Sequence, residues 1–284
     1  MTLASTRTLL HRARAQRAAV GAFNVIHLET AEALVAAAER SGHPVILQIS
    51  ENCVTFHGGR LDPIARATLA LADASTAEVA VHLDHAEDPA LALEAIDLGF
   101  SSVMFDGAKL PFDENVATTR RIVVAAHAAG ADVEAELGEI GGKDGAHAPH
   151  VRTDPDEASL FVAETGVDAL AVAVGSSHAM TSRTAGLDLD LVARLASSVP
   201  VPLVLHGSSG VPDDTIVAGI AAGLVKINVS THLSAAYTAA VRAYLDGNGA
   251  VVDSRKYVAA GNAALSAEAA RLLELFAAKH PAFA

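Results

Sequence analysis

The stretch VPVPLVLHG, residues 199–207, is apolar over seven successive positions and then changes to a histidine and a glycine. The stretch VDALAVAVG, residues 167–175, has the same character. A strand with one solvent-exposed face alternates polar and apolar residues, whereas an unbroken apolar run is typical of a parallel sheet covered on both faces. These stretches therefore predict a parallel sheet enclosed by helices.

The rest of the chain alternates short β-branched runs with alanine-rich helical patterns. Strands are predicted at 20–24, 45–50, 79–84, 102–106, 132–137, 169–175, 201–206 and 224–230. Helices are predicted at 30–41, 61–74, 88–98, 113–129, 155–165, 188–197, 213–222 and 232–246. Eight strand–helix units within 284 residues predict one α/β domain, residues 1–284, folded as a TIM (β/α)8 barrel. The alternative to a closed barrel is a doubly wound sheet. A helical tail is predicted at about 252–284, after the eighth unit.

Composition limits the function classes. The net charge of -13 disfavours binding to nucleic acid and to anionic membranes, so neither partner is expected. The sequence has no signal pattern and no apolar run long enough to cross a membrane. A single cysteine, Cys53, excludes an internal disulfide and is consistent with a cytoplasmic protein.

Polar residues occur where the predicted strands end, the position at which barrel enzymes place their sites. These residues are Asn24, Ser50, Asp84, His85, Asp106, Glu136, His178, His206 and Asn228. Three histidines from separate strands, His85, His178 and His206, can converge on one Zn²⁺ and leave a coordination position open. The alternative is three separate histidines that hydrogen-bond water. The pair His147 and His150 is interpreted as solvated loop residues.

Carboxylates accompany these histidines. Asp84 precedes His85 in HLDH, where it either exchanges a proton with a substrate hydroxyl or only orients an imidazole. Glu136 lies on the same strand face as Glu134 and is a candidate additional metal ligand. The glycine-rich loop that follows carries Asp144, and it is either a mobile lid or an ordinary surface turn.

Two segments offer backbone N–H groups to a phosphate. They are HGSSG at residues 206–210 and NVST at residues 228–231, after the seventh strand and at the end of the eighth. Barrels commonly bind phosphate at these two loops. Lys226, Asn228 and Ser230 alternate with apolar residues, so their side chains are predicted to face the barrel interior.

Together these motifs resemble the class II family of fructose- and tagatose-bisphosphate aldolases. The matching segments are AFNVIHLET, SEN…HGG (50–59), HLDH, VEAELGEIGG, AVAVGSSH, LVLHGSSG, KINVST and DSRKY. They extend over nearly the whole chain, and their combination is specific although no single motif is.

The resemblance implies a zinc-dependent enzyme that reversibly cleaves a ketose (bis)phosphate into dihydroxyacetone phosphate and an aldehyde. It implies zinc held by His85, His178 and His206, with Glu136 at an alternative metal position. It implies that Asp84 takes the proton of the C4 hydroxyl and that a loop acid, here Asp144, moves the proton at C3. The implied substrate-binding residues are Asn24, Ser50, Gly207, Ser208, Ser209, Asn228, Ser230 and Thr231. A monovalent cation, Na⁺ or K⁺, and a homodimer or homotetramer are also implied.

Three positions depart from the family pattern. The loop acid is Asp144 in GGKDG rather than a glutamate, and Ala179 replaces the glycine after the second zinc histidine. Asn262 occupies the tail position where a basic residue usually reaches the second phosphate. The third departure predicts an aldehyde half that is altered or not phosphorylated.

Other functions explain fewer residues. A metal-dependent hydrolase usually has an HxH pair on its first strand, but FNVIH carries His27 alone. A Schiff-base aldolase that uses Lys226 leaves the three histidines unexplained. The alternative that is not an enzyme is a relative of the family that binds a sugar phosphate without turning it over.

Overall fold

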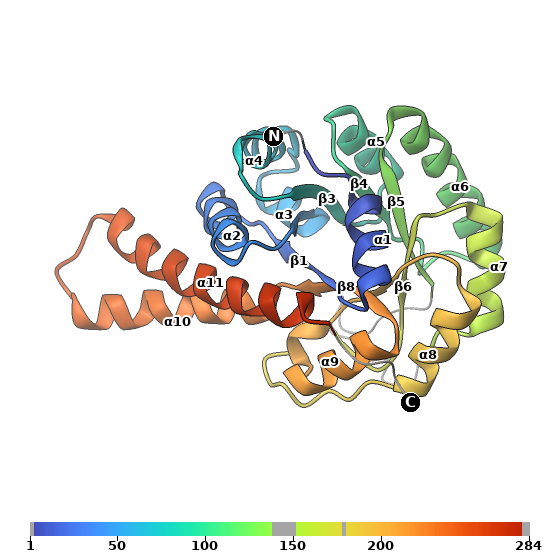
Figure 1. The fold of residues 1–284 in the computed structure, drawn as a ribbon. Coiled ribbons are helices and arrows are strands. Elements are labelled where there is room, and N and C mark those ends of the chain that lie inside the picture. The colour runs from blue at the N-terminus through green and yellow to red at the C-terminus, as the bar shows by residue number, and fades with distance from the viewer. Residues whose placement is uncertain (1–2, 138–151, 178–179, 280–284) are drawn as a thin grey trace.

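In the computed structural model, eight parallel strands close into a barrel in chain order (Figure 1). The structure describes residues 3–137, 152–177 and 180–279. The strands are β1 (Val20–Asn24), β2 (Val45–Ser50), β3 (Val79–Ala86), β4 (Ser102–Phe105), β5 (Asp132–Leu137), β6 (Ala169–Val172), β7 (Leu203–Leu205) and β8 (Leu224–Val229). The TIM-barrel prediction is confirmed.

Helices surround this barrel, close one of its ends and project from its side. They are α1 (Thr6–Gln16), α2 (Leu28–Ser41), α3 (Glu51–Phe56), α4 (Asp62–Ala74), α5 (Pro89–Asp97), α6 (Phe112–Ala129), α7 (Pro155–Thr165), α8 (Leu189–Ser198), α9 (Asp213–Ala222), α10 (Thr231–Gly247) and α11 (Ser254–Ala277), with a 3-10 turn η1 (Ser208–Gly210). Asp88 and Asp154 cap α5 and α7, each followed by a proline at the first helical position. All eight predicted helices and the helical tail are present, whereas α1, α3 and η1 were not predicted.

Two predicted strands, 169–175 and 201–206, are each three residues shorter in the structure. Strand β7 begins at Leu203 rather than at residue 201, since Pro200 and Pro202 have no N–H to donate to a neighbouring strand. Strand β6 ends at Val172 because the next residues bond to loops: Ala173 N–H donates to Thr153 Oγ1 over 2.8 Å.

The apolar residues form two cores. The larger core lies between the strands and the surrounding helices, and the smaller core fills the inside of the barrel near the N-terminal ends of the strands. In the smaller core, Leu9, Leu10 and Ala13 of α1 pack against inward residues of the strands, such as Ile46 and Met104. Helix α1 therefore closes the N-terminal end of the barrel and leaves the opposite end for a site.

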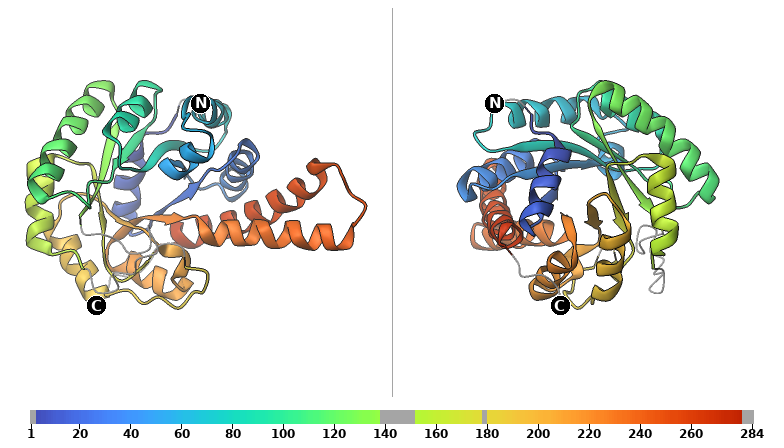
Figure 2. Two further views of the ribbon diagram at one scale, coloured as in Figure 1. Left: turned by 180° about the vertical axis from the view of Figure 1, so that it is seen from behind. Right: turned by 45° about the vertical axis from the view of Figure 1, so that its right-hand side comes forward.

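The last two helices form an antiparallel pair that projects from the barrel (Figures 1 and 2). Its base packs on α2 and β1 through α11 residues such as Leu273 and Phe276, which are almost wholly buried. Val252, between the two helices, is 94% exposed. In the described part of the chain, no helix is long and apolar enough to cross a membrane.

Candidate active site

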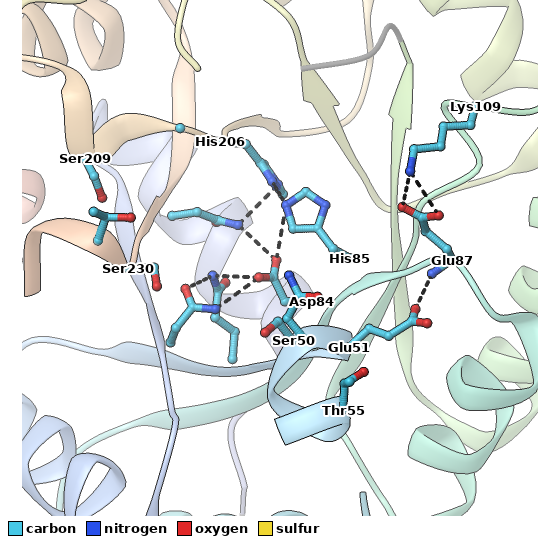
Figure 3. Close-up of a pocket in the computed structure, with 16 residues that line it drawn as sticks. Ser50, Glu51, Thr55, Asp84, His85, Glu87, Lys109, His206, Ser209 and Ser230 are labelled. Atoms are coloured by element: carbon cyan, nitrogen blue, oxygen red, sulfur yellow. Dashed lines mark hydrogen bonds and ion pairs between the residues drawn. The ribbon is translucent and has the colours of Figure 1, made fainter. Parts of the chain in front are cut away.

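A pocket opens at the carboxyl ends of the strands (Figure 3). Of the predicted site residues, ten line it: Asn24, Ser50, Asp84, His85, His206, Gly207, Ser209, Asn228, Ser230 and Thr231. Ser209 and Ser230 lie at one end and Glu51, Glu87 and Lys109 at the other, with Asp84 and His85 between them. The pocket is therefore elongated, with its titratable centre in the middle.

Strand β3 brings two successive side chains into this centre. Alternation along a regular strand would turn Asp84 and His85 to opposite faces. The register against β4 shifts between Leu83 and Ala86, and His85 adopts a left-handed backbone with φ of 51°. This bulge turns both side chains toward the pocket, at a conformational cost of about 1–3 kcal/mol for a residue other than glycine.

Of the three predicted zinc ligands, His85 and His206 lie in the described part of the chain, and their rings face each other. His85 Nε2 lies 2.7 Å from His206 Nδ1, and the rings are nearly perpendicular at 84°. The outer nitrogens donate to carboxylates, with His85 Nδ1 2.9 Å from Asp106 Oδ2 and His206 Nε2 2.9 Å from Glu134 Oε1. Each ring thereby directs its remaining lone pair at the other ring.

That donor arrangement fits a divalent cation. Metal-bound imidazoles commonly donate their second N–H to a carboxylate, which fixes the tautomer. Two groups of potential ligand atoms overlap at His85, one with Asp84 and His206 and one with Asp106 and Glu136. Glu136 is fully buried, and its Oε2 lies 4.0 Å from His85 Nδ1. The second group supports an additional metal position for Glu136.

Asp84 is held by three amide groups. Asn24 Nδ2 and Gln48 Nε2 donate to Oδ2 over 3.2 and 3.3 Å, and Asn228 Nδ2 donates to Oδ1 over 3.3 Å. Burial alone would raise the pKa of this carboxyl, but nearby His85 and His206 outweigh burial, so its pKa lies below the ordinary value. Asp84 is therefore an ionised carboxylate that three amides hold in place beside the histidines.

The end of the pocket nearest β7 and β8 is built from backbone and hydroxyl groups. Gly207 has a φ of 67°, and a Cβ there would come within 2.7 Å of the Ser177 backbone, so the close approach requires glycine. His232 N–H at the start of α10 donates to Ser209 Oγ over 3.2 Å. The Ser208 hydroxyl instead donates to the Asn228 carbonyl and its side chain does not line the pocket, so we assign that side chain to holding the loop.

The opposite end carries charged side chains. Glu87 pairs with Lys109 over 3.0 Å, and the Glu87 and Asp88 N–H groups donate to Glu51 Oε2 over 2.6 and 3.4 Å. Among the described residues that line the pocket, Lys109 is the one lysine or arginine. Asn262 does not line it.

Several predicted residues lie outside the described part of the chain: His178, Ala179, Asp144, His147 and His150. Conversely, the structure shows contacts at the site that the sequence did not assign: Gln48 lies beside Asp84, and Asp106 and Glu134 lie behind the histidines. The sequence identifies Asp106 only as a strand-end residue, and Gln48 and Glu134 can be placed at the site only when the strand register is known.

Lys226 does not fit the role of a Schiff-base nucleophile. Its side chain is fully buried beneath the pocket, and its ammonium lies 2.7 Å from Glu134 Oε2. An amine that attacks a carbonyl must be neutral and must reach the substrate, and an ion-paired amine outside the pocket lining does neither. The inward orientation predicted for Lys226 and Asn228 is confirmed by their contacts with Glu134 and Asp84.

Comparisons with known proteins agree with this geometry. The family model described as fructose-bisphosphate aldolase class-II matches residues 4–280. Fructose-bisphosphate aldolases from Thermus caldophilus and Geobacillus stearothermophilus are each 39% identical to the chain, and each match covers 94% of the chain. The matches cover 96% of the Thermus protein and 94% of the Geobacillus protein. The crystal structure of the YdjI aldolase from Escherichia coli K12 superposes with a TM-score of 0.85 at 31% identity, covering 98% of both chains. The chain therefore belongs to the class-II fructose-bisphosphate aldolase family and is an aldolase, a lyase that cleaves a carbon–carbon bond.

Proposed function

We propose that the protein is a zinc-dependent aldolase that reversibly cleaves a ketose 1-phosphate or 1,6-bisphosphate into dihydroxyacetone phosphate and an aldehyde. The observation that carries this proposal is the facing pair of His85 Nε2 and His206 Nδ1, each ring backed by a carboxylate and bordered by Asp84. His178 is the third proposed ligand. Bound zinc would act as a Lewis acid that stabilises the charge developing beside the bond that breaks.

Asp84 is the proposed base for the C4 hydroxyl. Cleavage between C3 and C4 requires that this hydroxyl lose its proton as the aldehyde carbonyl forms. Asp84 Oδ1 lies 4.0 Å from His85 Nε2, so a hydroxyl near the histidines is within its reach. Asn24 and Asn228 hold the carboxylate and line the same pocket, which supports their proposed role in orienting the substrate hydroxyls. Asp144 remains the proposed acid for the proton at C3.

The phosphate of dihydroxyacetone phosphate is proposed to bind at the end of the pocket lined by Gly207, Ser209, Ser230 and Thr231. Thr231 is the first residue of α10, and the N-terminus of a helix favours an anion. The hydroxyls of this end can donate to phosphate oxygens. A local site of this kind is needed because the net charge of -13 repels phosphorylated metabolites.

The other end of the pocket favours an uncharged aldehyde half. Glu51 and Glu87 give two negative charges there against the single positive charge of Lys109, and Lys109 is engaged by Glu87. A phosphate dianion at this end would meet a net negative surface, whereas the hydroxyls of a sugar can hydrogen-bond both carboxylates. We therefore propose that the aldehyde product carries hydroxyls and no phosphate.

The decisive experiment compares kcat/KM for aldol cleavage of ketose 1-phosphates and of fructose and tagatose 1,6-bisphosphate, with identification of the products. Relatives named fructose-bisphosphate aldolase make fructose 1,6-bisphosphate the reference substrate. A 1-phosphate that is cleaved as well as or better than the bisphosphates supports the aldehyde-side proposal. A preference of about 100-fold or more for a bisphosphate contradicts that part alone, and no cleavage of any ketose phosphate after zinc addition contradicts the whole proposal.

We further propose a homodimer or homotetramer and activation by Na⁺ or K⁺. The projecting α10–α11 pair exposes Val252 and Leu245 near its tip, which supports burial against a second copy. Light scattering of the purified protein measures the oligomer, and cleavage rates in Na⁺, K⁺ and tetramethylammonium buffers measure the cation requirement.

A further inference from the structure

A column of buried polar side chains runs down the inside of the barrel from the metal-site histidines. His206 Nε2 lies 2.9 Å from Glu134 Oε1, and the other oxygen of that carboxylate accepts from Lys226 Nζ over 2.7 Å. Lys226 Nζ also lies 3.4 Å from His82 Nε2. His206, Lys226 and His82 have no exposed surface, and Glu134 is 2% exposed.

The column continues to the closed end of the barrel. His82 Nδ1 lies 2.7 Å from Ser102 Oγ, which in turn lies 2.8 Å from Thr6 Oγ1 of α1. Burial and the charge of Lys226 lower the pKa of His82 to about 3, so this imidazole is neutral. Glu134 and Lys226 form the ion pair of the column, and their charges cancel.

Such a pair is not required for the stability of a barrel. Two buried charges are costly to desolvate, and well-packed apolar residues of similar volume often serve stability equally well or better. Lys226 also lies outside the pocket lining, so it does not contact a substrate bound there. The feature that the pair does control is the acceptor presented to His206.

The orientation of His206 depends on that acceptor. An imidazole has two nitrogens, and the one that carries the proton is set by the hydrogen bond of the other. The Glu134 carboxylate is paired with Lys226 and lies 2.9 Å from Nε2, closer than Asn228 Nδ2 at 3.2 Å, so it holds the proton on Nε2 and leaves the Nδ1 lone pair directed at His85. Lys226 occupies the second carboxylate oxygen and prevents rotation of the carboxylate away from His206.

We propose that Lys226 is a positioning residue for the metal centre, acting through Glu134 to fix the tautomer and the orientation of His206. This inference rests on the proposed function, since it assumes that His206 is a ligand. It assigns to Lys226 a role in metal affinity and none in covalent chemistry with the substrate.

The test uses the full-length protein and measures zinc affinity by competition with a chromophoric chelator. Lys226→Met and Glu134→Gln are each expected to weaken zinc binding by about 10–100-fold, the usual effect of losing an outer hydrogen-bond partner of a ligand. In Glu134→Gln an NH2 donor replaces one of the two oxygens that accept separately from His206 and Lys226, so one of these two hydrogen bonds is lost. Ser102→Ala is the matched control, because it breaks the same column beyond His82, and it is expected to change zinc affinity less than about threefold.

Two further measurements separate positioning from general damage. The nitrogen chemical shifts of His206 in the metal-free protein are expected to report a proton on Nε2 in the wild type and a mixture of tautomers in Lys226→Met. The double variant Lys226→Met/Glu134→Gln removes both buried charges, so it is expected to fold even where a single variant does not, and to bind zinc weakly. A folded Lys226→Met or double variant with wild-type zinc affinity and a wild-type His206 tautomer overturns the inference. Failure of the wild type to bind zinc would instead contradict the proposed function.

Discussion

Replacing Asp84 with asparagine removes the proposed base while keeping its shape. In the wild type, two amides donate to Oδ2 and one donates to Oδ1. An asparagine can keep its oxygen toward Asn24 and Gln48 and turn its NH2 group toward Asn228. The Asn228 oxygen has no hydrogen-bond partner among the described residues, so a flip of the Asn228 amide supplies the missing acceptor. The fold and the pocket are therefore expected to persist.

The expected loss is in the chemical step. A positioned acid–base group contributes about 10²–10⁴ in rate, or about 2.7–5.4 kcal/mol at 1.36 kcal/mol for each factor of ten. Metal content and KM for the ketose phosphate are expected to change little, because the histidine pair and the phosphate end of the pocket contain no atom of Asp84. The kcat for cleavage is expected to fall by the full factor.

A second reaction distinguishes a local chemical defect from a damaged site. Exchange of the C3 proton of dihydroxyacetone phosphate with deuterium oxide does not involve the C4 hydroxyl, so Asp84→Asn is expected to retain it within about tenfold. Mass spectrometry of the recovered dihydroxyacetone phosphate measures this exchange. Near-normal cleavage by the metallated variant would return Asp84 to orienting His85, and equal loss of cleavage and exchange would indicate that the whole site is disturbed.

Four other outcomes follow from the structure. Removal of metal with a chelator should abolish cleavage and added Zn²⁺ should restore it; full activity in the chelated enzyme, checked by metal analysis, contradicts the proposed metal requirement. Gly207→Ala forces a left-handed backbone on a residue with no room for its Cβ, so calorimetry should detect a loss of about 1–3 kcal/mol and KM should rise; an unchanged KM argues against phosphate binding at this loop. Glu87→Gln should raise kcat/KM for a bisphosphate relative to its 1-phosphate by about 3–10-fold, whereas Glu78→Gln, which also breaks a surface ion pair but far from the pocket, should not. Burial raises the pKa of Cys53 to about 11, so at pH 8 only about one thiol in a thousand is ionised and alkylation followed by mass spectrometry should be slow until the protein unfolds; rapid modification of the folded protein would refute its burial.

Most of the barrel could be predicted because its strands and helix starts are local signals. Apolar runs indicate the strands and Asp-Pro pairs indicate the helix starts, and neither signal depends on which segments pack together in the fold. Helix α1 was missed although Ser5 caps it and Leu9, Leu10 and Ala13 form a helical stripe. Its stabilisation comes from covering the end of a barrel, and that surface exists only after all eight strands have closed.

The site divides in the same way. His85 and His206 could be predicted because each directly follows or ends an apolar strand. Their partners Asp106 and Glu134 could not be paired with them, since that requires the register between strands that are far apart in sequence. The orientation of Asp84 and His85 was also beyond sequence reasoning, because strict alternation would have separated them.

The bulge in β3 joins these observations into one physical account. A left-handed histidine is unfavourable by itself, yet the His85 ring gains a hydrogen bond to Asp106, and beyond the bulge Ala86 accepts from the Asp106 N–H over 2.8 Å. The same residue after β4 therefore anchors both the side chain and the backbone that follow the strained position. Without the bulge, a regular β3 could present either Asp84 or His85 to the pocket, but not both. The local strain thus places the Asp84 carboxylate 4.0 Å from the His85 nitrogen that faces His206, so one strand delivers two successive polar side chains to the pocket.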